Sequence, residues 1–118
     1  NGGDGGAIVN ISSAAARLGS PNEYIDYAAS KGALDTLTIG LAKELAGEGV
    51  RVNAVRPGII DTEIHASGGV PDRVEKLKDK LPMGRAGTAD EVAQPVVWLL
   101  SDEASYITGA LLDIAGGR

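Results

Sequence analysis

The sequence contains no cysteine and only one histidine, His65. Without cysteine the chain can form no disulfide, thiolate nucleophile or cysteine-ligated metal site, and one histidine argues against a histidine-based zinc site. Aromatic residues make up only 3% of the chain. The core must therefore be built from Val, Ile, Leu and Ala, as is typical of parallel sheets that helices cover.

An excess of positive charge is also missing. The chain has 11 basic and 16 acidic residues, for a net charge of −5, so it offers no basic stripe for nucleic-acid phosphates. Its longest apolar run, VVWLL at 96–100, is far shorter than the roughly 20 residues of a membrane span. The sequence shows no basic leader followed by an apolar stretch. We therefore expect a cytoplasmic protein with no metal, nucleic-acid or membrane partner.

Several segments have the pattern of regular structure. Short runs rich in β-branched residues predict strands at 7–12, 50–55 and 110–115. Between them the pattern predicts a long helix at 23–46 and a helix at 89–101, with a short charged helix near 71–80. In the long helix, leucines recur at spacings of three and four and predict one apolar stripe: Leu34, Leu37, Leu41 and Leu45.

Individual residues indicate where the helix at 89–101 begins and where it should bend. Thr88 and Glu91 stand at the spacing of a capping box, which predicts that the helix begins there. Pro95 lies beyond its first turn and should kink it. The order strand, helix, strand, helix, strand predicts an α/β fold, a Rossmann-like parallel sheet with βαβαβ order that is half of a doubly wound sheet.

In such a sheet, ligands bind at the carboxyl ends of the strands. Ser12 and Ser13 end the first predicted strand, and residues 57–62 follow the second. The long helix begins above the same edge and carries Tyr27 and Lys31, four residues apart and so on one face. We expect these side chains to meet at one rim.

This combination suits proton transfer to or from an alcohol or carbonyl oxygen. A free phenol has a pKa of about 10, and a nearby ammonium group lowers the pKa of a phenol by stabilising its phenolate. A general acid or base works best when its pKa is near the operating pH. A serine hydroxyl opposite the phenol can hold the substrate oxygen and stabilise its developing charge.

Five motifs together resemble one known family. They are IVNISS at 8–13, YAASK at 27–31, RVNAVRPGIIDT at 51–62, PMGRAGTADEVA at 82–93 and SYITGALLDIAGG at 105–117. Their order and spacing resemble the C-terminal half of a short-chain dehydrogenase/reductase, an NAD(P)-dependent oxidoreductase. The resemblance covers nearly the whole chain.

The resemblance implies roles for three catalytic residues. Tyr27 is similar to the family's acid/base, and Lys31 to the residue that tunes the phenol's pKa and binds the nicotinamide ribose. Ser13 is similar to the residue that positions the substrate oxygen. It is 14 residues from Tyr27, one more than is common in the family, so Ser12 is an alternative.

The resemblance also implies a cofactor site. The turn Pro57–Thr62, with Gly58, the backbone of Ile60 and the Thr62 hydroxyl, is similar to the turn that holds the nicotinamide carboxamide. Residues 59–82 correspond to the variable substrate loop. The expected cofactor is NADP or NAD, with NADP favoured, and the expected substrate is a small carbonyl or alcohol.

Some family features are missing. No G-x-G-x-x-G phosphate turn occurs in the chain, and neither does the residue that selects NAD or NADP or the family's active-site asparagine. Residues 1–118 are therefore expected to form the C-terminal half of one Rossmann-type domain, without its N-terminal cofactor-phosphate half. The alternatives left open are a non-catalytic fragment or oligomerisation piece, and an epimerase or dehydratase with the same Tyr/Lys pair.

The remaining polar and aromatic residues have simpler interpretations. His65 is expected to be exposed. The acidic residues Asp61, Glu63 and Asp72 are expected to form a solvated face. Tyr24 and Tyr106 are expected to be packing or surface residues, and Trp98 a core or interface residue. A homodimer or homotetramer is expected, through the helices at 23–46 and 89–101.

Overall fold

The structure is a computed structural model that describes residues 5–19, 21–22, 25–61 and 81–118. The expected helix near 71–80, His65, Thr62 and Tyr24 lie outside the described residues. The strands are β1 (Gly6–Ile11), β2 (Val50–Pro57), β3 (Ile60–Asp61), β4 (Gly87–Thr88) and β5 (Leu111–Ile114). The helices are α1 (Ala15–Leu18), α2 (Ile25–Leu45), η1 (Ala46–Glu48), α5 (Ala89–Leu100) and η2 (Asp102–Ala104).

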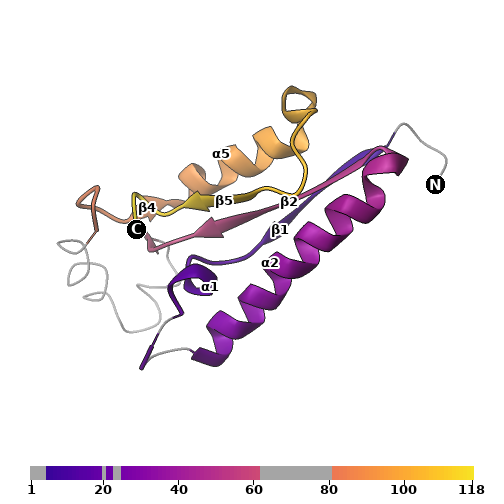
Figure 1. Ribbon diagram of the computed structural model, residues 1–118. Coiled ribbons are helices and arrows are strands. Elements are labelled where there is room, and N and C mark those ends of the chain that lie inside the picture. The colour runs from indigo at the N-terminus through magenta and orange to yellow at the C-terminus, as the bar shows by residue number, and fades with distance from the viewer. Residues whose placement is uncertain (1–4, 20, 23–24, 62–80) are drawn as a thin grey trace.

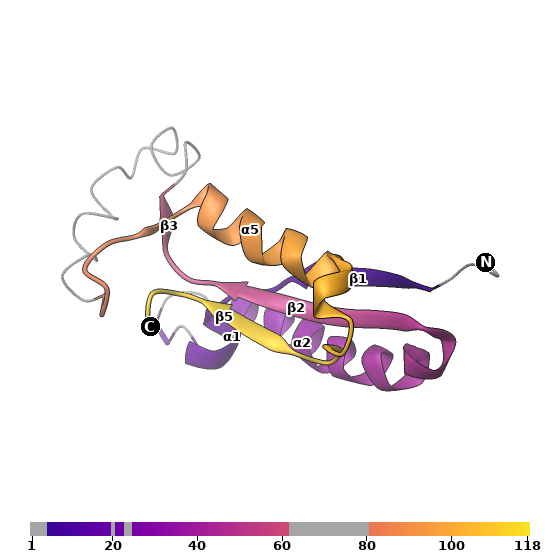
Figure 2. The same cartoon turned by 90° about the horizontal axis from the view of Figure 1, so that it is seen from above.

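The main sheet has the order β1-β2-β5. Both pairs of strands are parallel, with Gly6 opposite Val50 and Ala54 opposite Leu111. Helices α1 and α2 cover one face of the sheet and α5 covers the other (Figures 1 and 2). The predicted α/β fold with a parallel Rossmann-like sheet is therefore confirmed.

The α5 side of the sheet is an apolar core. Val55 of β2 and Leu99 of α5 are at most 1% exposed, and Ala104 packs with them. Partly buried apolar side chains surround this cluster: Val9, Val96, Ile107 and Ile114. Val9, Val55 and Ile114 of the strands thus help to fill the α5 side of the sheet, as the composition predicts.

The leucines that recur along α2 are not among the residues that the helix buries. The buried residues of α2 are Ala28, Asp35, Thr38 and Ala42, whereas Leu37 is 53% exposed. The other three leucines of the predicted stripe are only partly buried. Small and polar side chains therefore form the buried face of α2, and the recurring leucines lie beside that face.

The short elements α1, β3 and β4 were not predicted. Residues 15–18 form the single helical turn α1, and β3 pairs in parallel with β4. At the start of α5 the Thr88 side chain accepts a hydrogen bond from the Glu91 N–H while Glu91 bonds back to the Thr88 N–H, so the predicted capping box is confirmed. Helix α5 runs through Pro95 as one helix. Among the described residues, no helix has the length and apolar character to cross a membrane.

Candidate functional site

The carboxyl ends of β1, β2 and β5 meet at one rim, beside α1 and the start of α2 (Figure 1). Backbone hydrogen bonds connect the chain just beyond each strand. The Ala14 N–H donates to the Pro57 carbonyl oxygen at 2.9 Å, and the Gly58 N–H donates to the Ile114 carbonyl oxygen at 3.0 Å. The segments that carry the predicted site residues are thus held close together at this rim.

Tyr27 and Lys31 lie one turn apart near the start of α2. The Lys31 ammonium nitrogen stands 5.7 Å from the centre of the Tyr27 ring, within the range of a cation–π contact. The same nitrogen donates a hydrogen bond to the Ile11 carbonyl oxygen at the end of β1, at 3.1 Å. The Tyr27 side chain is 47% exposed. Phenol and ammonium therefore share one face of α2 at the rim, where a substrate could reach them.

The two serines that follow β1 have different environments. Ser12 is buried, and its hydroxyl donates to the Lys31 carbonyl oxygen at 3.3 Å. Ser13 is only partly buried, and its oxygen accepts a hydrogen bond from the Ala15 N–H at 3.1 Å. Ser12 thus attaches β1 to α2, whereas the Ser13 hydroxyl hydrogen has no acceptor among the described residues and could be donated to a ligand.

The turn after β2 packs tightly against the end of β5. A Cβ atom placed on Gly58 would lie 2.8 Å from the Ala115 Cβ, so only glycine fits there without movement. Ile60 begins β3 opposite Gly87, and the Gly87 N–H donates to the Ile59 carbonyl oxygen at 2.9 Å. Pro57, Gly58 and Ile60 therefore stand at the rim, and the position of predicted Thr62 lies outside the described residues.

A group of charged side chains beneath the rim was not predicted from the sequence. The Arg56 guanidinium binds both oxygens of Asp113, at 2.8 and 3.1 Å, and its Nη1 lies 3.5 Å from the Asp35 Oδ2. The hydrogen bond to Asp113 raises the pKa of Arg56, against the opposing effect of burial. Arg56 and Asp113 occur inside strand patterns and are opposite each other only through the β2–β5 register. Nothing in the sequence indicated that pairing.

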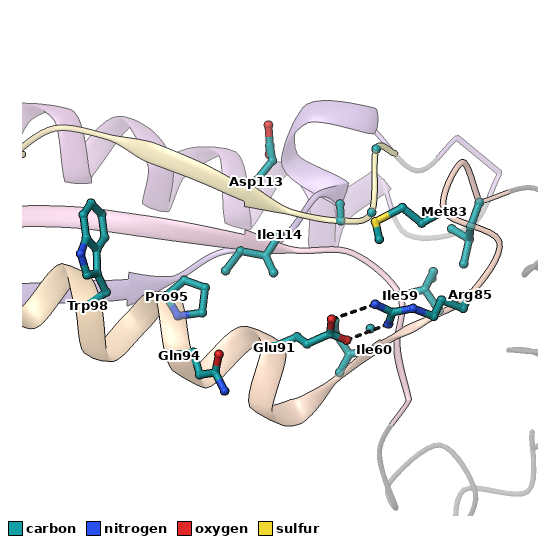
Figure 3. A pocket seen from close by; sticks show the side chains of 15 residues that line it. Ile59, Ile60, Met83, Arg85, Glu91, Gln94, Pro95, Trp98, Asp113 and Ile114 are labelled. Carbon is teal, nitrogen blue, oxygen red and sulfur yellow. Dashed lines mark hydrogen bonds and ion pairs between the residues drawn. The ribbon is translucent and has the colours of Figure 1, made fainter.

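A hollow lies on the α5 side of the sheet. A groove of about 810 Å³ runs between α5 and the end of β5. Figure 3 shows that Gln94, Pro95 and Trp98 line it from α5, while Ile114 points toward α5 and Asp113 points away. None of Ser13, Tyr27 and Lys31 lines this groove, although Ile60 does. The residues that suit proton transfer are thus at the open rim rather than in this groove, and their chemistry makes the rim the better candidate site.

An exposed ion pair holds the start of α5. The Arg85 guanidinium binds the Glu91 carboxylate through two hydrogen bonds, at 2.7 and 2.9 Å (Figure 3). This contact, together with the hydrogen bond from the Thr88 N–H, lowers the pKa of Glu91 to about 2, from an ordinary value of 4.5. Glu91 is therefore ionised at neutral pH and serves as part of the helix cap.

Comparison with known proteins finds relatives that are described as oxidoreductases. A family model described as Enoyl-(Acyl carrier protein) reductase matches residues 2–118. An Escherichia coli protein described as an uncharacterized oxidoreductase, YgfF, is 67% identical over 118 residues, which are 100% of this chain and 48% of the relative. A 3-oxoacyl-[acyl-carrier-protein] reductase of Thermotoga maritima, FabG, is 44% identical over 113 residues, 95% of this chain and 45% of the relative. The chain thus spans about half the length of the curated relatives that it matches.

The backbone of the chain is also similar to solved structures. The reductase LugOII, described as promiscuous and as catalysing a keto-reduction, superposes with a TM-score of 0.87 at 42% identity, over 97% of this chain and 44% of that one. ElxO with NADP bound superposes with a TM-score of 0.82 at 37% identity, over 94% of this chain and 45% of that one. The order and placement of the described elements therefore match those of these solved structures.

Proposed function

Since the chain belongs to the short-chain dehydrogenase/reductase family, we propose that the protein transfers a hydride between NAD(P) and a small carbonyl or alcohol substrate. The observation that carries the proposal is the Tyr27/Lys31 pair at the rim, with the ammonium nitrogen 5.7 Å from the ring centre. Tyr27 acts as the general acid when the carbonyl is reduced and as the general base in the reverse direction.

The rim residues fit the nicotinamide end of the cofactor. Among the described residues, the Lys31 ammonium donates one hydrogen bond, to the Ile11 oxygen. An ammonium has three N–H groups, so two are left to bind ribose hydroxyls. The backbone at Ile60 and the Thr62 hydroxyl are proposed to hold the carboxamide, beside the close contact of Gly58 with Ala115.

The bound nicotinamide supplies or accepts the hydride. In reduction, the partly buried Ser13 hydroxyl donates a hydrogen bond to the substrate carbonyl oxygen and orients it. Tyr27 gives its phenolic proton to that oxygen as the alcohol forms. Lys31 keeps positive charge beside the phenolate that remains. Ser13 is proposed for this role rather than Ser12, because the Ser12 hydroxyl already donates to the Lys31 carbonyl oxygen.

NADP is the proposed cofactor, with NAD as the alternative. The support is that one similar solved structure, ElxO, is described with NADP bound. Titration of the natural full-length polypeptide that carries these residues with NADPH and with NADH measures the preference directly. A smaller dissociation constant for NADH would reverse the assignment.

The acid/base role is tested by Tyr27→Phe in the same full-length polypeptide. NADPH oxidation is followed against a panel of aliphatic ketones, sugar ketones and 3-oxo esters, and the substrate reduced fastest is used. We expect kcat to fall by about 10²–10⁴-fold, the usual contribution of a positioned acid or base, while NADPH still binds. Near-normal rates in this variant would contradict the role.

The matched control is Tyr106→Phe, which removes the same hydroxyl from a tyrosine that is 100% exposed. Its kcat should stay close to that of the parent. No reduction of any ketone by the parent would contradict the proposed reaction itself.

A second candidate is that these 118 residues alone are not an enzyme. The chain spans 45–48% of its relatives' length and contains no G-x-G-x-x-G. In β1, which pairs only with β2 among the described strands, Ile8 is 43% exposed and Ile11 49%. Titration of the 118-residue chain with NADPH should then show no tight binding, and a dissociation constant near that of the full-length polypeptide would contradict this candidate.

A homodimer or homotetramer is proposed through α2 and α5. On α5, Val97 is 65% exposed and Leu100 45%, and on α2 Leu37 is 53% exposed. Burial of these apolar side chains against a second copy would remove them from water. Light scattering of the full-length polypeptide gives the number of copies, and a single copy at micromolar concentration would contradict the proposal.

A further inference from the structure

Helix α2 is placed on the sheet by directional polar contacts. Its buried residues include only two apolar ones, Ala28 and Ala42, and both are small. The Asn10 side chain of β1 donates to the Thr38 hydroxyl oxygen at 2.9 Å, and Thr38 is fully buried. Hydrogen bonds lose strength steeply with distance and angle, so they fix the position of the helix more sharply than the apolar contacts of the two alanines and the partly buried leucines can.

Arg56 connects α2 with two strands. Its guanidinium binds Asp113 of β5 through two hydrogen bonds and lies 3.5 Å from the Asp35 carboxylate of α2. The side chains of Arg56 and Asp35 are 15% and 10% exposed. The other oxygen of Asp35, Oδ1, is buried and accepts no hydrogen bond from any residue that the structure describes. Among those residues, Arg56 is therefore the cation that compensates the Asp35 charge.

This ion pair belongs to the same helix face as the proposed acid/base. Asp35 follows Lys31 by four residues and Tyr27 by eight, so the three side chains project one above another along α2. The turn at Lys31 is attached to the end of β1 through the Ile11 oxygen and the Ser12 hydroxyl. One turn further, the Arg56–Asp35 contact attaches α2 to β2, two residues before Gly58.

We propose that Arg56 and Asp35 are positioning residues that hold α2 so that Tyr27 and Lys31 stand at the rim. The proposal rests on the proposed function, because it concerns the same acid/base. Neither residue touches the reacting atoms. Without Arg56 the buried Asp35 carboxylate would have no compensating charge, and the helix would shift until water could hydrate it. The Tyr27 phenol would move together with the helix.

The test uses the full-length polypeptide with NADPH and the ketone selected above. For Arg56→Met we expect kcat per folded enzyme to fall roughly ten- to hundredfold, because a misplacement of about 1 Å can cost about 10²-fold. KM for NADPH should change by less than about twofold, since the effect is on the chemical step. Arg56→Lys keeps the cation and should recover part of the lost kcat.

A double variant separates positioning from a merely structural role. Asp35→Leu combined with Arg56→Met removes both buried charges, while Asp113 is 39% exposed and keeps Arg17 at 3.6 Å, so thermal stability should return toward that of the parent. If the pair positions α2, kcat stays at least about tenfold low in this stable protein. Recovery of kcat together with stability would overturn the proposal.

The control is Lys43→Met, which removes a cation from the exposed side of α2 and should leave kcat unchanged. Tyr27→Phe in the same assay distinguishes the two hypotheses. An inactive Tyr27→Phe beside a fully active Arg56→Met overturns only the positioning role. An active Tyr27→Phe overturns the proposed function.

Discussion

Substitution of Gly58 by alanine tests how tightly the rim is packed. The added Cβ would lie 2.8 Å from the Ala115 Cβ and 3.1 Å from the Ala115 Cα. Carbon atoms in contact prefer a separation of about 3.5–4.0 Å, so the ends of β2 and β5 must move apart by roughly 1 Å. That movement also stretches the hydrogen bond from the Gly58 N–H to the Ile114 oxygen, now 3.0 Å.

Two opposing effects decide how much Gly58→Ala changes the free energy of unfolding. Overpacking of this kind costs about 1–3 kcal/mol, whereas replacing glycine by alanine gains about 0.4–1 kcal/mol by restricting the unfolded chain. Gly58→Ala should therefore lower the free energy of unfolding by about 1–2 kcal/mol. The assay is urea unfolding of the full-length polypeptide, followed by circular dichroism.

Two further variants show whether the contact with Ala115 is the cause. Ala115→Gly in the Gly58→Ala background removes the 2.8 Å contact and should recover part of the loss. Gly40→Ala, where an added Cβ meets nothing within 4 Å, should instead stabilise α2 by about 1 kcal/mol. A Gly58→Ala protein as stable as the parent would refute the close packing of the rim.

Three other predictions concern the core, the cap and the assembly. Leu99→Ala empties the α5 side of the core, where Leu99 is 1% exposed, and should cost about 2.7–5 kcal/mol in the same urea assay. The pKa of Glu91 is lowered to about 2, so its contribution to stability is complete above its ordinary pKa of 4.5 and is lost as pH falls through 2. Thermal melts should show Glu91→Gln less stable than the parent at pH 7 and close to it below pH 2, and an equal deficit at both pH values would contradict the ionic cap. Val97→Glu adds a charge to a residue that is 65% exposed on α5 and should reduce the number of copies seen by light scattering if α5 is an interface.

The parts of the fold that follow from local patterns could be predicted. Runs of β-branched residues indicated the three strands of the main sheet, each to within one or two residues of β1, β2 and β5. The capping box at Thr88 and the spacing of Tyr27 and Lys31 depend only on residues within one helical turn. The stretch before α2 was less predictable, since the turn α1 is stabilised by a contact with the Ser13 hydroxyl that no periodicity reveals.

The buried face of α2 could not be predicted from periodicity. Leucines recur along it, but the sheet beneath presents Asn10 and Arg56, and the helix therefore turns Thr38 and Asp35 toward them. A hydrophobic pattern indicates where an apolar surface lies, not whether its partner is apolar. The spacing of the leucines therefore predicted the helix, but it did not indicate which residues of the helix are buried.

The amino-acid sequence alone determined the order of strands and helices, the family resemblance and the spacing that puts a phenol and an ammonium group on one helix face. Only the tertiary structure decided which serine hydroxyl is left to donate a hydrogen bond and why Gly58 must be glycine. It alone also decided that Arg56 joins Asp113, 57 residues away, to Asp35. The physical reason is that these contacts depend on strand register and on how α2 lies on the sheet. Both result from the packing of the whole sheet and its helices, and no local pattern records them.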